Sequence, residues 1–309
     1  MSAAQAPAAE EKEPEKPNFD ELMEQLDSLV GLETVKKEVK NLMYLVKVRK
    51  LRQENELPVP PMSFHMVFLG NPGTGKTSIA RKMGEILQSM DVLPTSKVVE
   101  ASRATLVGKY MGETPKIVNA MCDKAIGGIL FIDEAYTLSD QNDQYGREAI
   151  DTLMKRMEDD RGKFVVIAAG YRTEMENLFR INPGMRSRFN YNLDIEDYTP
   201  EELFEIMKHF AKEKNYVFSD EAEKLARKLI EERYKTRDNT FANGRTMRML
   251  FDEMVKRQAM RLQKEDASMM TNEHLMTIEE ADVPYEAKQT VDYTECLKKF
   301  DGMVGLASV

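Results

Sequence analysis

Tryptophan is absent from the sequence, and only two cysteines and three histidines occur among its 309 residues. Cys122 and Cys296 lack metal-ligand spacing, so we expect reduced thiols rather than a disulfide framework or a zinc site. The histidines at positions 65, 209 and 274 have no partners at catalytic or metal spacing, and we predict no role for them.

Long apolar runs and an excess of basic residues are also missing. No stretch approaches the roughly 18 apolar residues of a membrane span, and the N-terminus has no apolar signal segment. We therefore expect a cytoplasmic protein without a membrane partner. The net charge is −9, whereas nucleic-acid-binding proteins are more often basic because they neutralise phosphates. Nucleic acid is thus disfavoured as a partner.

The residues that are present suffice for a globular core. Hydrophobic residues make up 42% and charged residues 31%, which fits one large domain or two smaller ones. Residues 1–17 are dominated by Ala, Glu, Pro and Lys and cannot offset the entropy of ordering by burial, so we predict a disordered leader. Apolar residues at helical spacing then predict one helix from Phe19 and a second from about Glu33, ended by residues 54–62.

A glycine-rich turn follows an apolar strand predicted at Phe64–Leu69. Residues 70–77, GNPGTGKT, fit the pattern G-x-x-x-x-G-K-[ST] in full, and we call them the phosphate loop. Glycines let backbone N–H groups curl around phosphate oxygens, and the next helix adds its dipole. We expect Lys76 to reach the β- and γ-phosphates of ATP and Thr77 to ligate Mg²⁺. The predicted ATP- or ADP-binding residues here are Gly70, Asn71, Pro72, Gly73, Thr74, Gly75, Lys76, Thr77 and Ser78.

A second apolar strand, Ile129–Ile132, ends in two carboxylates, Asp133 and Glu134. The carboxyl end of a strand in a parallel sheet opens on the nucleotide. We therefore expect Asp133 to hold Mg²⁺, directly or through water, and Glu134 to polarise the attacking water.

Two more strands are predicted at Lys97–Ala101 and Phe164–Ala169. The helices predicted between the strands cover Thr77–Met90, Thr114–Lys124 and Arg147–Glu158. This alternation predicts an α/β fold with a doubly wound parallel sheet over residues 18–195. The pattern then becomes all helical, which predicts a smaller helical lid domain over residues 196–284.

The chain resembles an AAA+ ATPase module, and more narrowly the group of CbbX (the red-type Rubisco activase, also called CfxQ), stage V sporulation protein K and the cytosolic ATPase of type VII secretion. The similarity covers roughly residues 20–283 and is carried by LVGLETVKKEV, GNPGTGKT, RATLVGKYMGET, ILFIDEAYTL, VVIAAGY, NPGMRSRF and NGRTMR. It implies a five-stranded phosphate-loop fold and hydrolysis of ATP to ADP and phosphate. It also implies a homo-oligomeric ring, a hexamer, that acts on a protein partner.

The resemblance assigns further roles outside the phosphate loop. The segment Val30-Gly31-Leu32 would pack on adenine. Arg188, with Arg186 as second choice, would be the arginine finger that reaches the nucleotide of the next subunit, where its fork of donors suits phosphoryl charge. Arg245 matches the sensor-2 arginine and would reach the γ-phosphate from the helical lid.

Two other loops are singled out by the resemblance. The sensor-1 position commonly carries Asn, but here the strand runs into Gly170-Tyr171, which leaves Tyr171 as the candidate. In ring-shaped unfoldases an aromatic–hydrophobic–glycine loop faces the central channel, which predicts that Tyr110 and Met111 grip a substrate chain there. Residues 137–147 are the candidate for a second channel-facing loop.

The C-terminal phrase DGMVGLASV, residues 301–309, repeats five of the nine residues of DSLVGLETV at 27–35. We expect residues 285–309 to be a linker and the start of a second AAA+ module, with chance similarity as the alternative.

Three functions compete at this point. The first is an ATP-driven motor that remodels or threads a protein partner. The second is a nucleotide-gated assembly scaffold, which need not retain the full set of Lys76, Asp133, Glu134 and Arg188. The third is a DNA-associated motor, which the acidity and the lack of a basic helix–turn–helix segment disfavour.

Overall fold

The computed structural model describes residues 19–60, 62–139, 143–237, 241–264 and 271–285. The predicted leader, residues 140–142 of the second candidate channel loop and residues 286–309 of the predicted linker and module start lie outside these ranges. The chain divides into two compact units, the first comprising residues up to Phe210 together with Arg237–Met249, and the second comprising the remainder. Within the described ranges, no helix is both long and apolar enough to cross a membrane.

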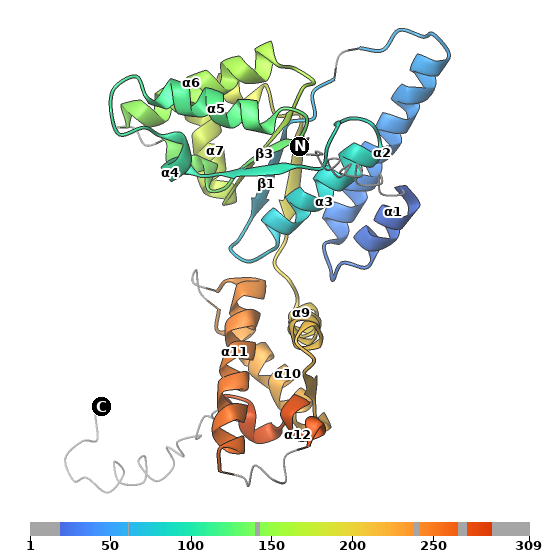
Figure 1. Cartoon of the computed structure of the whole chain (residues 1–309), viewed down its shortest axis with the longest axis vertical. Coiled ribbons are helices and arrows are strands. Elements are labelled where there is room, and N and C mark those ends of the chain that lie inside the picture. Colours follow the sequence, from blue (N-terminus) through green and yellow to red (C-terminus); the bar gives the residue numbers. More distant parts are fainter. Residues whose placement is uncertain (1–18, 61, 140–142, 238–240, 265–270, 286–309) are drawn as a thin grey trace, which may run out of the picture. The chain divides into compact units, whose positions relative to one another are not determined.

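A five-stranded parallel sheet forms the middle of the first unit (Figure 1), with strand order β2-β3-β4-β1-β5. The strands are β1 (Met66–Gly70), β2 (Val98–Ala101), β3 (Ile129–Ile132), β4 (Val165–Gly170) and β5 (Tyr191–Ile195). In the register, Met66 of β1 lies between Ile167 of β4 and Tyr191 of β5. The strand that leads into the phosphate loop therefore has a hydrogen-bonded neighbour on each side.

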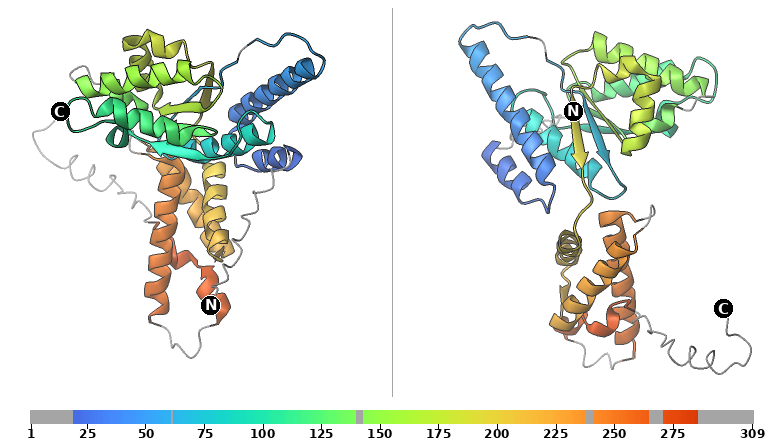
Figure 2. Two further views of the ribbon diagram at one scale, coloured as in Figure 1. Left: turned by 45° about the horizontal axis from the view of Figure 1, so that its top comes forward. Right: turned by 180° about the vertical axis from the view of Figure 1, so that it is seen from behind.

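Helices cover both faces of this sheet (Figure 1, Figure 2). One face packs against α1 (Phe19–Asp27), α2 (Glu33–Glu54) and α3 (Lys76–Ser89). The other packs against α4 (Arg103–Leu106), α5 (Thr114–Ala125), α6 (Gln144–Asp159), α7 (Arg172–Ile181) and α8 (Pro183–Arg186). Because strand side chains alternate, Met66 and Phe68 join the first core and Val67 and Leu69 the second. The predicted doubly wound α/β fold is confirmed.

The predicted strands and helices match the observed ones to within a few residues, but β5 was not located from the sequence. In β5 the polar residues Asn192 and Asp194 interrupt the apolar ones, and only Leu193 and Ile195 are buried. The strand lies at the edge of the sheet, so it pairs with a neighbouring strand, β1, along one side only. Its short alternating pattern therefore gave a weaker signal than the continuous apolar runs of β3 and β4.

Helices dominate the C-terminal part of the chain, as predicted. They are α9 (Pro200–Glu213), α10 (Asp220–Lys235), α11 (Asn243–Leu262), α12 (Asn272–Met276) and a 3-10 turn at Glu280–Asp282. A short parallel pair, β6 (Val217–Phe218) with β7 (Thr277–Ile278), is an addition that the sequence pattern did not show. In the second unit the buried Gln258 amide donates to the carbonyls of Leu275 and Thr277, which holds the α12 segment against α11.

Candidate nucleotide-binding site

A cavity of about 640 Å³ opens in the first unit at the carboxyl ends of β1, β3 and β4. Most of the predicted nucleotide-site residues line it: Val30, Leu32, Pro72, Gly73, Gly75, Lys76, Thr77, Ser78, Asp133, Glu134 and Arg245. Gly31, Gly70, Asn71 and Thr74 belong to the same two loops without lining the cavity. Segments far apart in the sequence thus converge on one concave site.

The phosphate loop has the backbone that its glycines predict. Gly73 and Gly75 have φ values of +70° and +89°, a region that residues with side chains rarely adopt. Gly75 precedes the first residue of α3, so the N-terminus of that helix opens into the cavity. The Thr74 side chain is buried and its hydroxyl donates to the Asn71 carbonyl over 2.9 Å, which holds the turn closed.

Lys76 is held at the mouth of this loop. Its Nζ donates to the carbonyls of Gly70 and Asn71 over 2.9 and 2.8 Å. Burial lowers the pKa of the Lys76 ammonium below its ordinary value; the carboxylate of Asp133 acts in the opposite direction, and the guanidinium of Arg245 lowers this pKa further. Two cationic side chains therefore share the cavity, where an anionic ligand would relieve their repulsion.

The carboxylates that follow β3 are both exposed on the cavity wall. The Asp133 Oδ1 accepts a hydrogen bond from the Glu134 N–H over 3.0 Å, which fixes the orientation of its side chain. Glu134 has a φ of +48°, an uncommon conformation for a residue with a side chain and one that often marks functional sites.

The oxygen donors present fit a magnesium ion. The Thr77 hydroxyl and the Asp133 carboxylate line the same cavity, and Mg²⁺ prefers such oxygen ligands together with substrate phosphates.

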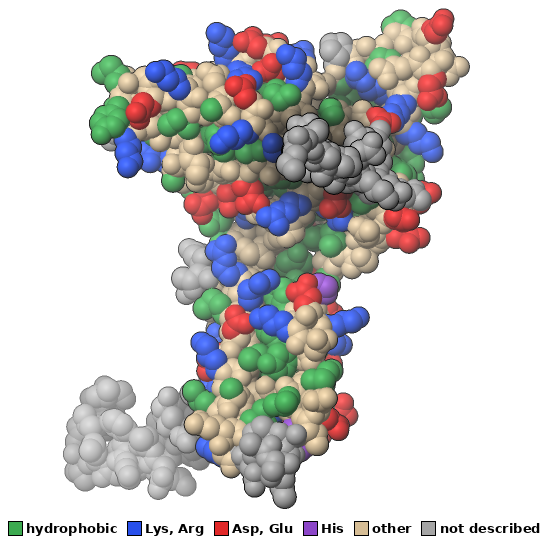
Figure 3. Space-filling view, viewed as in Figure 1, with side chains coloured by type: hydrophobic (Ala, Val, Ile, Leu, Met, Phe, Trp, Pro, Cys, Tyr) green, Lys and Arg blue, Asp and Glu red, His purple; other side chains and the backbone are tan. Residues whose placement is uncertain are grey.

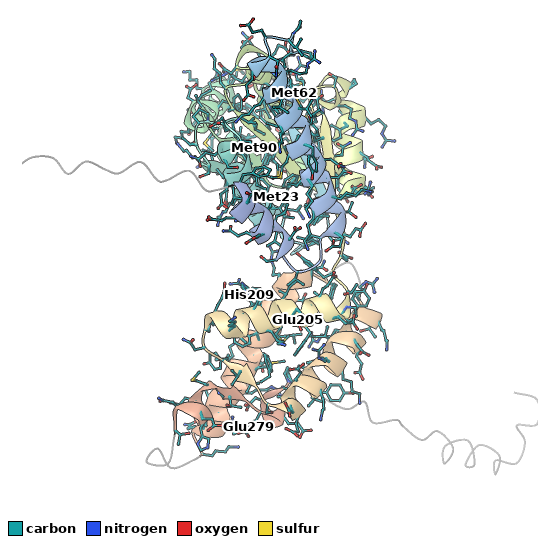
Figure 4. All side chains as sticks on the ribbon, turned by 90° about the vertical axis from the view of Figure 1, so that its right-hand side faces the viewer. Met23, Met62, Met90, Glu205, His209 and Glu279 are labelled. Carbon is teal, nitrogen blue, oxygen red and sulfur yellow. The ribbon has the colours of Figure 1, made fainter. Side chains whose placement is uncertain are left out.

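The cavity lining also includes apolar side chains. Val30 and Leu32 are joined in it by Ile206 and Phe210 of α9, two residues that no motif predicted as site residues. His209 of α9, labelled in Figure 4, lines the cavity as well. The turn at Gly31 needs a glycine, because its φ is +61° and a Cβ there would lie 2.4 Å from the Glu202 carboxylate. Such a surface suits the flat apolar faces of a nucleotide base.

Tyr171 lines the cavity beside Lys76, whose Nζ lies 5.8 Å from the centre of the tyrosine ring. Its ring also packs against Tyr136, with the ring centres 5.5 Å apart. Burial raises the pKa of Tyr136, and the Glu134 carboxylate raises it further, so the Tyr136 phenol stays a neutral hydrogen-bonding group at physiological pH. Tyr171, the sensor-1 candidate, therefore lies next to Lys76 on the cavity wall.

The two candidate finger arginines lie outside the cavity lining. The guanidinium of Arg186 stacks over the ring of Phe179, with 5.4 Å from its carbon to the ring centre. Arg188 is half-buried and its Nη1 donates to the Gly184 carbonyl over 2.8 Å.

The predicted channel residues lie on a loop of residues 107–113, which we call the channel loop. Tyr110 and Met111 at its tip are 70% and 84% exposed. Its base is ordered, because the Glu113 carboxylate accepts from the N–H groups of Lys109 and Tyr110. The loop thus presents an aromatic and a thioether side chain on a supported backbone.

Several site residues were not found from the sequence. Asp197, Tyr198 and Asn243 support the phosphate loop through hydrogen bonds. Asp197 and Tyr198 lie in none of the motifs, whereas Asn243 begins NGRTMR but was given no role. Arg248, the last residue of NGRTMR, was also given no role; it lines the cavity one turn after Arg245, and its guanidinium stacks over Phe210 at 4.5 Å. The motif and the helical spacing of three residues between the arginines were the available signals for Arg248.

Comparison with known families agrees with this geometry. Residues 66–197 match the family described as "ATPase family associated with various cellular activities (AAA)". Residues 199–292 match the family described as "AAA lid domain".

Several characterised proteins are similar over most of their length. Stage V sporulation protein K of Bacillus subtilis is 41% identical over 265 residues, which cover 85% of this chain and 82% of that protein. Protein CbbX of Cereibacter sphaeroides is 40% identical over 266 residues, which cover 85% of each of the two proteins. The chloroplastic ribulose bisphosphate carboxylase/oxygenase activase of Cyanidioschyzon merolae is 38% identical, with 86% of this chain and 91% of that protein covered.

Among solved structures, a variant of RuvB from Thermotoga maritima superposes with a TM-score of 0.55 at 19% identity, covering 83% of this chain and 68% of that one. That likeness supports the fold alone. The matched families and the sequence relatives lead to one conclusion. The chain belongs to the AAA family of ATPases, in the group that contains CbbX, CfxQ and stage V sporulation protein K, and it is a nucleotide-binding enzyme that hydrolyses ATP.

Proposed function

We propose that this protein couples ATP hydrolysis to the remodelling or threading of a protein partner, and that it works as a homo-oligomeric ring, a hexamer, in the cytoplasm. The observation that carries the proposal is the pairing of a complete nucleotide cavity with an exposed Tyr110-Met111 tip on a supported loop. An aromatic side chain can grip an extended chain by packing and by a phenol hydrogen bond without reading its sequence.

The residues of the cavity divide the work of hydrolysis. The phosphate-loop N–H groups and Lys76 bind and orient the phosphates, while Thr77 and Asp133 hold Mg²⁺, which neutralises phosphate charge when bound. Glu134 orients the attacking water and accepts its proton. Arg245, on the helix that continues into the second unit, contacts the terminal phosphate. Tyr171 takes the sensor-1 position, where its hydroxyl is available to orient the water.

The arginine finger is assigned to Arg188, acting on the nucleotide of the next subunit, with Arg186 as the alternative. The structure supports this assignment in one respect, because neither arginine lines the cavity of its own chain. Arg188→Ala should therefore bind ATP normally and fail to hydrolyse it. Mixing Arg188→Ala with Lys76→Ala subunits should restore activity at interfaces that combine an intact loop with an intact finger. Native mass measurement of the mixtures checks that mixed rings form; mixed rings without activity would exclude the trans role.

The proposed action on protein is tested by measuring ATPase rate with an unfolded protein, such as reduced and alkylated casein, and with duplex DNA. Stimulation by the unfolded protein alone supports a protein-remodelling motor. Stimulation by DNA alone would favour a DNA-associated motor, and a rate unmoved by either would favour an assembly scaffold. On the face shown in Figure 3, Lys and Arg side chains are interspersed with Asp and Glu, as expected for a protein that does not track along phosphates.

The Glu134→Gln variant also provides a way to identify the partner. It should retain ATP while hydrolysing it slowly, so a bound substrate should be retained in the ring. Co-purification with this variant, compared with Glu134→Gln/Tyr110→Ala as the matched control, should yield a protein that depends on Tyr110.

A further inference from the structure

One buried side chain, Asn243, connects the phosphate loop to the helix that carries Arg245. Its Nδ2 donates to the Pro72 carbonyl over 3.2 Å and to Oδ1 of Asp197 over 2.8 Å. Its Oδ1 accepts from the N–H of Tyr198 over 3.2 Å. All of these residues belong to the first unit.

Asp197 extends the same network along the phosphate loop. Its two carboxylate oxygens each accept from the Asn71 Nδ2 at 3.0 Å. The next residue, Tyr198, is buried, and its hydroxyl donates to the Thr74 carbonyl over 3.2 Å. Burial raises the pKa of Tyr198 to about 12, so the hydroxyl keeps the proton that it donates. Thr74 and the Asn71 side chain are therefore tied directly to the segment between β5 and α9, and Pro72 is tied to it through Asn243.

The backbones also approach each other closely at this point. The Gly244 N–H donates to the Gly73 carbonyl over 3.0 Å, and a Cβ on Gly73 would lie 1.9 Å from the Ala242 carbonyl oxygen. Asn243 itself is fully buried with a φ of +41°, a conformation that Asn tolerates better than most residues. An asparagine in this conformation can begin α11 and turn its amide toward the loop at once.

We infer that Asn243 and Asp197 are positioning residues that lock the phosphate loop to the start of α11, so that Lys76 and Arg245 are held in one frame around the phosphates. The amide of Asn243 supplies two bonds as donor and one as acceptor, and the carboxylate of Asp197 receives donors from both sides. Neither residue lines the cavity, so both act on ATP through the loop and the helix, and the charge of the Asp197 carboxylate also raises the pKa of Lys76. The inference rests on the nucleotide site proposed above.

Exchanging the two side chains, Asn243 and Asp197, separates their effect on the position of the phosphate loop from their effect on the stability of the fold. Asn243→Asp keeps size and backbone tolerance but places a second carboxylate against Asp197. Asp197→Asn places amide donors against the amides of Asn71 and Asn243. The exchange Asn243→Asp/Asp197→Asn restores a donor–acceptor pair at unchanged net charge, although the bond to Pro72 stays lost.

The experiment measures ATP affinity by titration, together with KM and kcat of hydrolysis, for the full chain and each variant. Asn243→Asp should weaken ATP binding at least about tenfold and also lower kcat, because a hydrogen bond to a charged partner is replaced by repulsion. The double exchange should bind ATP at least about threefold more tightly than Asn243→Asp, since the two positions are coupled. If Asn243→Asp fails to fold, Asn243→Gly removes the side chain while keeping the left-handed backbone and should show the same loss.

Two controls separate the outcomes. Gln258→Ala removes a different buried amide from α11 and should lower thermal stability while leaving KM and kcat within about twofold. Lys76→Ala should lose ATP binding; if it binds ATP like the parent chain, the proposed nucleotide site itself is wrong. If Lys76→Ala loses binding while the Asn243 variants keep the parental affinity, or if the double exchange is no better than Asn243→Asp, the positioning role is overturned and the site stands.

Discussion

The phosphate loop follows β1, and the channel loop follows α4, the short helix after β2. Both loops contain glycine, yet they are built in opposite ways. In the phosphate loop, carbonyls along the turn accept hydrogen bonds from Lys76, Asn243, Gly244 and Tyr198, and Thr74 is fully buried. In the channel loop, the backbone hydrogen bonds run to Thr114 and Glu113 at the end of the loop, and the Tyr110 and Met111 side chains at the tip are exposed.

The difference follows from what each loop is proposed to bind. A phosphate has one fixed geometry, and backbone N–H groups bind it best when the backbone is already held in place. A substrate chain presents changing side chains, and an exposed aromatic side chain can pack against many of them. The comparison predicts that substitutions in the two loops will affect different steps.

Loss of the catalytic carboxylate should have the largest effect. Glu134→Gln removes water activation while leaving the phosphate contacts, so kcat should fall at least about a hundredfold with ATP affinity retained. Steady-state hydrolysis and nucleotide titration measure the two quantities. Turnover near the parental rate would mean that Glu134 does not activate the water.

Removal of the tyrosine at the channel loop should affect only the work on protein. Tyr110→Ala should abolish stimulation of hydrolysis by unfolded protein while basal hydrolysis stays within a few-fold, because the loop does not line the cavity. Tyr110→Phe keeps the ring and should retain part of the stimulation. Loss of ATP binding in Tyr110→Ala would indicate a structural tyrosine and would remove the contrast between the loops.

Two glycines with similar backbones provide a matched pair. Gly73 and Gly112 have φ values of +70° and +79°, but a Cβ at Gly73 would clash with Ala242, whereas one at Gly112 would meet no described atom within 4 Å. Gly73→Ala should weaken ATP binding at least about tenfold, because the strain of about 1–2 kcal/mol adds to the clash. Gly112→Ala should carry the strain alone and keep the parental affinity. Titration and thermal denaturation distinguish the two; equal losses of affinity would show that close packing at Gly73 is not required.

Substitution of His65, which lies in neither loop, should have the smallest effect, and it should change the stability of the fold rather than one step of the reaction. His65 is buried next to the amino end of β1, and its Nδ1 accepts from the Val166 N–H over 2.9 Å. Burial lowers the pKa of His65 from 6.5 to about 4, so the unfolded chain binds this proton more readily than the folded one. The free energy of unfolding should therefore be nearly unaffected by His65 above about pH 7.5 and fall as pH drops toward 4, by about 1.4 kcal/mol at pH 5.5.

The matched variant is His65→Asn, whose side-chain oxygen can accept the same bond without titrating. Denaturant unfolding at pH 7.5 and 5.5 should show a smaller pH dependence for His65→Asn than for the parent chain. An equal dependence in both would mean that burial does not lower the pKa of His65 in the folded chain.

Much of this molecule follows from local patterns in its sequence. The continuous apolar runs of β3 and β4 require burial on both faces, and the GNPGTGKT turn imposes its own backbone through Gly73 and Gly75. Asp133 and Glu134 could be predicted as site residues because they come directly after a buried strand, β3. In each case the residues that determine the feature are neighbours in the sequence, so β3, β4, the phosphate loop and the two carboxylates were predictable.

Other features depend on residues that only folding brings together. Asp197 and Asn243 are 46 positions apart and Asn71 is more remote still, yet their side chains meet within hydrogen-bond distance. Phe210 and Arg248 complete the cavity wall from two helices, and β5 pairs at the sheet edge with a pattern too polar to recognise. The sequence by itself determined the phosphate-binding and carboxylate groups of the site, because each of those loops encodes its own conformation. The tertiary structure alone decided which polar groups hold those loops together, because a hydrogen bond between distant segments leaves no periodicity in either one.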